Sequence, residues 1–237
     1  MAVHPDCYRY SRFCERYCQW FPKLSVSKRQ THKPGDKLFV DYVGQTLPNI
    51  DDASGEINQA QLFVAILGGS NYTYADATST QRLPDWIGSH VRTFEFLGGV
   101  TEIIVPDNLK SGVKHGSYYD PEINPTYRDF AWHYGVAVLP ALPYKPKDKA
   151  EVEGGVLIVE RWILARIPNQ RFFSLAEANR AMAEWFVLLN QRPFKKLSGC
   201  RHSAFLEMDC PLLNPLPQSL YEYAEWKAAR VGCRLSY

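Results

Sequence analysis

The sequence lacks the features that would identify a secreted, membrane-spanning or zinc-ribbon protein. It has no apolar run near the roughly 20 residues needed to cross a bilayer, and no signal peptide precedes the first cysteine. Its cysteines lack the paired C-x2-C spacing of a zinc ribbon. These absences predict a soluble, cytoplasmic protein with reduced thiols and no membrane partner.

The chain also has little excess charge, and neither internal repeats nor low-complexity tracts. Its formal net charge of +2 is too small to indicate nucleic-acid binding by itself, so any basic surface must come from local clustering. What the chain does have is hydrophobic content, 46% of 237 residues. That is enough to bury the core of one large domain with extensions.

Alternating strand and helix patterns fill the first half of the chain. Runs rich in Val, Phe, Tyr and Ile, broken by Gly, Ser and Asn, predict three successive antiparallel strands within 35–44 and 59–79. Near-helical spacing of apolar residues and short β-branched runs then predict a helix, a strand, a helix and a strand at 80–99, 100–106, 124–135 and 136–142. This order predicts an α/β domain with a mixed five-stranded sheet flanked by helices.

Helical patterns dominate the second half. Residues 147–167 predict a strong helix whose apolar stripe, which includes Val159, must face the sheet. Ser174 and Glu177 form the capping-box pattern of a further helix, which ends before Pro193. Residues 195–218 have no clear period, and a short helix is predicted at 219–231.

Asp41 is the first candidate functional residue. It lies within KLFVDYVG, where both faces of the predicted strand are apolar, which indicates a central strand. An ionised carboxylate buried there is costly unless a positive or hydrogen-bonding partner meets it. Asp41 is therefore expected either to pair with an arginine or hydrogen-bond to backbone amides, or to bind a cation.

Two further carboxylates occupy the ends of predicted elements. Asp107 directly follows the strand at 100–106, where it serves a functional loop or simply a turn or helix N-cap. Glu153, near the start of the helix at 147–167, lies roughly 85° from the centre of the apolar stripe. Glu151 lies on the opposite border, and both acids also suit an ordinary helix N-terminus.

The three carboxylates are more informative as a set. A strand, a strand end and a helix can bring them to one edge of the sheet, where three negative charges need compensation. Two Mg²⁺ ions would supply it, because they prefer hard oxygen ligands. Such a pair clamps the attacking and leaving oxygens of a phosphoryl displacement.

With these acids in place, the sequence resembles the DDE transposase and retroviral-type integrase superfamily, whose catalytic core has a ribonuclease H-like fold. It is similar in particular to the IstA-type bacterial insertion-sequence transposases, in the stretches VDYVGQTL, VPDNLKSGV, PKDKAEVEGGVLIVERWILARI, FFSLAEAN, LNQRPFKK and YEYAEWKAARV. The resemblance implies that Asp41, Asp107 and Glu153 bind two divalent ions, Mg²⁺ or Mn²⁺. It also implies 3′-end processing and strand transfer of insertion-sequence ends into target DNA.

The resemblance further implies partners and a domain plan. IstA-type proteins work with the AAA+ ATPase IstB, and we expect self-association on DNA in the bacterial cytoplasm. The plan is an N-terminal helical linker at 1–34, a catalytic domain at 35–194 and a C-terminal linker and helix at 195–237. Family members carry N-terminal helix-turn-helix domains and a C-terminal β-barrel, so we expect this chain to be the core of a longer protein.

Basic residues beside the predicted site are the candidate DNA contacts. YKPKDK places Lys145, Lys147 and Lys149 just before the acidic helix, and Lys110 follows the second aspartate. Lysines there would neutralise phosphates irrespective of base sequence, or would simply solvate a loop. Asn108 accompanies the second aspartate as in integrases, where the resemblance implies that it positions a ligand or phosphate.

Two other interpretations stay open. A ribonuclease H-like nuclease without transposition would use the same metals, and a catalytically silent DNA-binding or assembly module would keep the acids as structural groups. Metal binding separates the silent module from the enzymes, because a structural acid network should ignore Mn²⁺. A glycoside hydrolase gives no reason for the third acid or the lysines.

Overall fold

The structure is a computed structural model that describes residues 12–13, 15–16, 32–50, 55–106, 113–115, 122–139, 157–162, 165–166, 171–195 and 197–224. The chain divides into two compact units, Met1–Gln30 and Thr31–Tyr237. The described residues of the first unit are helical. The sheet and helices discussed below belong to the second unit.

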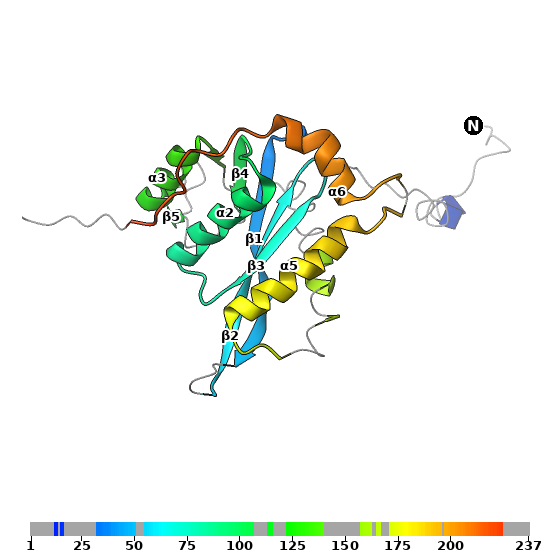
Figure 1. Ribbon diagram of the computed structural model, residues 1–237. Helices are drawn as coiled ribbons and strands as arrows, with labels where there is room; N and C mark the ends of the chain where they lie inside the picture. The colour runs from blue at the N-terminus through cyan, green and yellow to red at the C-terminus, as the bar shows by residue number, and fades with distance from the viewer. Residues whose placement is uncertain are drawn as a thin grey trace, which may run out of the picture. The chain divides into compact units, whose positions relative to one another are not determined.

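The sheet has five strands in the order β3-β2-β1-β4-β7 (Figure 1). β1 (Lys37–Ile50), β2 (Ile57–Leu67) and β3 (Thr73–Thr78) form an antiparallel meander. β4 (Ile103–Pro106) and β7 (Ala137–Val138) continue the sheet in parallel on the other side of β1. The mixed five-stranded sheet and the central position of β1 were both predicted, and both are confirmed.

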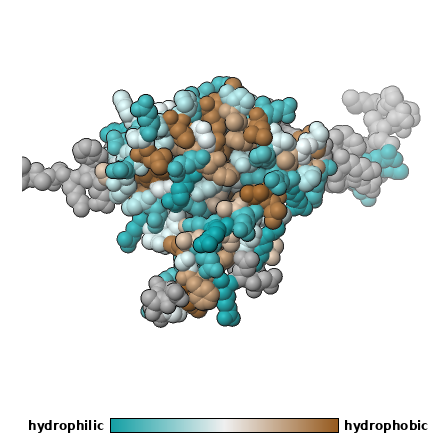
Figure 2. Space-filling view, in the orientation of Figure 1, coloured by the Kyte–Doolittle hydropathy of each residue, from teal (hydrophilic) through white to brown (hydrophobic). Residues whose placement is uncertain are grey.

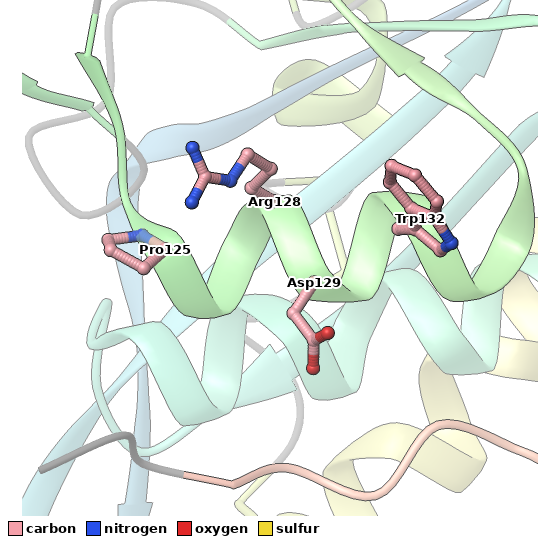
Figure 3. Close-up of a pocket in the computed structure, with 4 residues that line it drawn as sticks. All are labelled: Pro125, Arg128, Asp129 and Trp132. Carbon is pink, nitrogen blue, oxygen red and sulfur yellow. The ribbon is translucent and has the colours of Figure 1, made fainter.

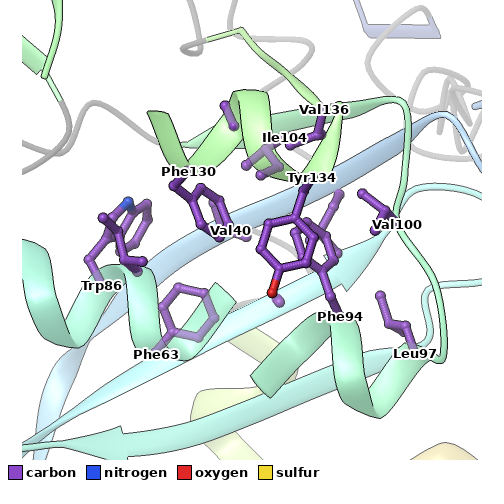
Figure 4. Packing of buried hydrophobic residues seen from close by; sticks show 14 of the residues in the cluster. Val40, Phe63, Trp86, Phe94, Leu97, Val100, Ile104, Phe130, Tyr134 and Val136 are labelled. Carbon is purple, nitrogen blue, oxygen red and sulfur yellow. The ribbon is translucent and has the colours of Figure 1, made fainter. Parts of the chain in front are cut away.

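Side chains alternate between the two faces of β1 and so enter two separate cores. Leu38, Val40 and Tyr42 join an aromatic-rich cluster with α2 (Leu83–Leu97) and α3 (Pro125–Tyr134) (Figure 4). Val43 joins the second cluster, which α5 (Leu175–Gln191) covers. The helices predicted within 80–99 and 124–135 are confirmed, and α2 ends at Gly98 in a left-handed conformation.

The predicted cap of α5 is also present. The Ser174 hydroxyl accepts the Glu177 N–H at 3.1 Å, as a capping box requires. The return bond differs, because Glu177 Oε2 accepts the N–H of Phe173 at 2.8 Å instead of that of Ser174. The helix ends before Pro193, where the sequence predicted its end.

Some elements were not predicted. A short hairpin of β5 (Val113–His115) and β6 (Glu122–Ile123) lies in a region read as loop. The stretch without clear period holds α6 (Arg201–Ala204), the π-helix η3 (Phe205–Asp209) and the 3-10 helix η4 (Cys210–Leu212). The helix predicted at 219–231 is wrong for its described part, since residues 219–224 are not helical.

Long-range hydrogen bonds explain why local patterns missed η3. The fully buried Asp209 accepts the Gly35 N–H at 2.7 Å and the Ser70 N–H at 2.9 Å, both distant in sequence. The residues that follow are held on α3, where Tyr221 donates its hydroxyl to Asp129 Oδ2 at 3.0 Å. These contacts form only when the sheet and α3 are in place, so the conformation is decided by tertiary structure.

The described surface mixes polar and apolar side chains. Apolar residues reach it in patches separated by polar ones (Figure 2). Of the six cysteines, the structure describes Cys200 and Cys210, and neither is in a disulfide. Among the described helices, none is both long and apolar enough to cross a bilayer.

Candidate functional site

Asp41 lies on the central strand, one residue beyond the last described pair between β1 and β4. It pairs with Val64 of β2 on one side. On the other side the last described pair is Val40 and Pro106. Asp107, the second predicted carboxylate, directly follows Pro106 in the sequence and lies outside the described residues.

The Asp41 side chain is half-buried rather than enclosed in the core. Phe39, on the same face of β1, packs against Val105 of β4, but the described part of β4 ends at Pro106, level with Val40. One carboxylate oxygen, Oδ1, accepts the N–H of Tyr42 at 2.8 Å. The expectation of a fully buried acid was therefore too strong.

Tyr42 holds this part of β1 in place from the opposite face. Its hydroxyl lies 3.4 Å from Thr78 Oγ1 and donates to the Thr80 carbonyl at 3.3 Å. Burial raises the pKa of the Tyr42 hydroxyl to about 12, so the group stays neutral and able to donate at neutral pH. The part of β1 that carries Asp41 is thus anchored to the end of β3.

The remaining predicted site residues lie outside the described residues. They are Asp107, Asn108, Lys110, Lys145, Lys147, Lys149, Glu151 and Glu153. Within the described part of the chain, no group of three or more His, Cys, Asp or Glu side chains is arranged to hold a metal ion. Of the three predicted metal ligands, the structure therefore describes Asp41 alone.

Part of the helix predicted at 147–167 is described and is anchored to α5. Residues 157–162 are helical, whereas 165–166 form a turn, so the predicted helix extended too far. Val159 is buried among α5 and sheet residues, as its apolar stripe predicted. The Trp162 indole N–H donates to the Trp185 carbonyl at 3.0 Å. The Arg166 guanidinium lies 3.7 Å from the centre of the Trp162 ring, a cation–π contact.

One surface was missed by the sequence reading. A pocket of about 290 Å³ on α3 is lined by Pro125, Arg128, Asp129 and Trp132 (Figure 3). A signal for it exists, because helical spacing puts Trp132 roughly 150° from the centre of the buried stripe of α3. A tryptophan on the polar face of a helix is unusual, but the spacing of apolar residues in this segment was used only to predict the helix itself.

The sequence is similar to several named bacterial proteins. No family model matches this chain. Two curated bacterial proteins, each named "Putative transposase", match almost all of it. That for insertion sequence IS408 of Burkholderia multivorans is 50% identical over 95% of this chain and 43% of its own length. The putative transposase for IS1162 of Pseudomonas fluorescens is 48% identical over 98% of this chain and 42% of its own length. The chain thus spans less than half the length of these relatives.

Solved structures share the fold at low sequence identity. A chain of the simian T-cell lymphotropic virus intasome has a TM-score of 0.54 and 14% identity, over 83% of this chain and 63% of that chain. The catalytic core domain of BIV integrase has a TM-score of 0.52 and 12% identity, over 73% and 95%. The chain therefore has the ribonuclease H-like fold of integrase catalytic cores, as the sequence resemblance implied.

Proposed function

We propose that this chain is the catalytic core of an insertion-sequence transposase of the IstA type. In this proposal it is a metal-dependent polynucleotidyl transferase that processes the 3′ ends of the element and joins them to target DNA. The observation that carries it is Asp41 on the central strand of a ribonuclease H-like sheet, beside the end of β4. The relatives named as putative transposases, which are 50% and 48% identical to this chain, support the choice of DNA as substrate.

The described acid fits a hard divalent cation. Asp41 offers carboxylate oxygen, the ligand type that Mg²⁺ and Mn²⁺ prefer, at a half-buried position on a rigid strand. Asp107 and Glu153 would complete the ligand set, with Glu151 as the competitor of Glu153. Two bound ions would lower the pKa of the attacking water or hydroxyl and stabilise the leaving oxygen.

The protein's own contribution is to position the ligands and the DNA. The bonds from Tyr42 to the end of β3 hold the strand that carries Asp41. The bond from Trp162 to α5 fixes the end of the helix in which Glu153 is predicted. Phosphate contacts are assigned to Asn108, Lys110, Lys145, Lys147 and Lys149. An IstB-type helper and self-association on DNA complete the proposal.

A cleavage assay tests the function. This chain is incubated with Mn²⁺ and labelled duplex DNA that carries the ends of its element, beside Asp41→Asn and the matched control Asp36→Asn. We expect Asp41→Asn to lose cleavage by on the order of 100-fold or more, because a neutral amide holds the cation poorly. Asp36→Asn should keep it, and both variants should bind the DNA as the wild type does.

The other outcomes separate the alternatives. Cleavage by Asp41→Asn at the wild-type rate would overturn the proposal. Cleavage without joining of the ends would favour a nuclease. No cleavage, together with no calorimetric heat from Mn²⁺ with DNA present, would indicate a silent assembly module. Loss of joining in Glu151→Gln with retention in Glu153→Gln would move the third ligand to Glu151.

A further inference from the structure

The outer face of α3 carries an aromatic ring and a cation that the fold does not use. The Trp132 side chain is 86% exposed, the most exposed of the large hydrophobic side chains that the structure describes. Arg128, one helical turn earlier, is exposed and has no hydrogen bond or ion pair through its guanidinium to any described residue. In Figure 3 both side chains project from the same side of the helix.

The neighbouring acid, Asp129, also lines the pocket, but it hydrogen-bonds to another partner. It projects away from Arg128 (Figure 3), and its Oδ2 accepts the Tyr221 hydroxyl at 3.0 Å. The C-terminal segment that carries Tyr221 also reaches His133, whose Nε2 lies 2.9 Å from the Ser219 carbonyl. This segment therefore contacts one side of α3, whereas Arg128 and Trp132 project from the other.

α3 lies on the face of the sheet to which Tyr42 points. β7 follows α3 and begins beside the start of β4, so α3 runs back from the end of β4, and Trp132 lies toward the start of β4. Tyr127, directly before Arg128, packs 6.2 Å from Trp86, which packs 5.7 Å from Tyr42. Asp41 belongs to the opposite face of β1, so this surface is separate from the position of Asp41.

We propose that Arg128 and Trp132 form a nucleotide-binding site for an unpaired DNA strand, with the guanidinium on a phosphate and the indole stacked on a base. The proposal rests on the proposed function, in which DNA is the substrate. Arginine binds phosphate in a fork geometry, and exposed aromatic rings stack on bases of any sequence. Bases within a duplex offer no free face to the ring, so the strand must be unpaired.

A protein partner suits the surface less well. A stable protein interface buries about 800 Å² on each side and needs an apolar centre. Within α3, Trp132 is the exposed large hydrophobic side chain, and its helical neighbours on this side are Pro125 and Arg128. A single ring and a single unpaired cation match one nucleotide.

The test measures DNA binding without catalysis. A fluorescein-labelled 20-nucleotide oligo-dT and a duplex of the same length are titrated with this chain in EDTA, and binding is followed by anisotropy. The variants are Trp132→Ala, Trp132→Phe and Arg128→Ala, with Arg180→Ala on α5 as the matched exposed-arginine control. All three positions are exposed, so thermal melting should stay at the wild-type temperature.

We expect Trp132→Ala to weaken binding of the single strand by about tenfold, and Trp132→Phe to restore most of the loss because a ring remains. Arg128→Ala should weaken it by about fivefold and reduce the salt slope by about 0.7, the value of one phosphate contact on a single strand. Oligo-dT should quench wild-type tryptophan fluorescence, and that quenching should be smaller in Trp132→Phe.

The proposal would be overturned by wild-type protein that does not bind oligo-dT. It would equally fail if Trp132→Ala and Arg128→Ala bound like Arg180→Ala, or if they lost affinity for the duplex as much as for the single strand. These results are independent of the Asp41→Asn cleavage assay. If the binding assay contradicts the α3 site but cleavage follows the expected pattern, the transposase proposal stands. If the cleavage assay contradicts the transposase proposal but the binding pattern is as expected, the α3 site still binds single-stranded DNA.

Discussion

The two faces of the sheet are packed by different chemistry. Under α2 and α3 the core is a network of rings in which Trp86 and His90 lie 4.6 Å apart and His90 and Phe130 lie 5.5 Å apart. Under α5 the core is mainly aliphatic, with Val64, Ile66, Met182 and Leu189 among its members. The ring network leads outward to the surface of α3, whereas the aliphatic core is closed by α5.

Hydrogen bonds differ between the faces as well. On the α5 side, Asn190 accepts the Thr73 N–H at 3.1 Å and donates to the Thr73 carbonyl at 2.8 Å. Asn179 binds the N–H and carbonyl of Ala77 in the same way, at 2.6 Å and 3.0 Å. β3 is an edge strand, so the two amides cover backbone groups that would otherwise be open to another strand.

The comparison indicates that the two faces of the sheet have different structural roles. The aromatic face holds the strand that carries Asp41 and places α3 near it, through packing that tolerates little change in volume. The α5 face anchors the helical segment 157–162 and protects the edge of the sheet. Three predictions test this difference.

The largest expected effect is a cavity in the ring network. Trp86 is fully buried and contacts Tyr42, Phe63 and Tyr127, so Trp86→Ala should lower the free energy of unfolding by about 4 kcal/mol. Met182→Ala, the matched truncation under α5, should cost about 3 kcal/mol, because the flexible thioether leaves a smaller void. Urea unfolding measures both, and a larger loss in Met182→Ala would reverse the ranking of the two faces.

The next effect is a pH dependence that belongs to the aromatic face. Burial lowers the pKa of His90 from 6.5 to about 4, so the folded protein keeps this imidazole neutral while the unfolded chain takes up a proton. Stability from this group is therefore complete above pH 6.5 and falls by up to about 3 kcal/mol as the pH drops toward 4.

His90→Phe should remove this component, because phenylalanine does not titrate. Urea unfolding at several pH values between 4 and 7 measures the difference in slope between the variant and the wild type. Equal slopes for His90→Phe and wild type would contradict the prediction, because they would show that the pKa of His90 does not differ between the folded and unfolded chain.

The smallest effect concerns the amide bonds to β3. Asn190→Ala should cost about 2 kcal/mol, because it leaves the buried N–H and carbonyl of Thr73 without their partner. Asn179→Ala should cost about 1 kcal/mol, since that site is half-buried and water can replace the amide. Gln191→Ala at the exposed end of α5 serves as control, and light scattering would detect association through an opened edge.

Much of the fold could be predicted because it depends on local patterns. The alternation in KLFVDYVG, the stripe of α5 and the Ser174 cap each specify an element through contacts within a few residues. The central position of β1 could also be predicted, because a strand with apolar residues on both faces must be buried on both faces. The η3 helix and the irregular residues 219–224 were not predicted, because their partners are far away in sequence. The β5–β6 hairpin was also missed, although its two strands pair locally with each other.

For the candidate site, the sequence by itself determined which acids are chemically eligible and that Asp41 belongs to a central strand. Tertiary structure decided that β4 ends beside Asp41, because strand pairing follows from the whole sheet and not from either segment. It also decided that Trp132 faces solvent while Phe130 is buried, since packing of α3 on the sheet selects one face of the helix. Local patterns choose the elements, and the burial available when those elements pack determines which side chains remain free to bind.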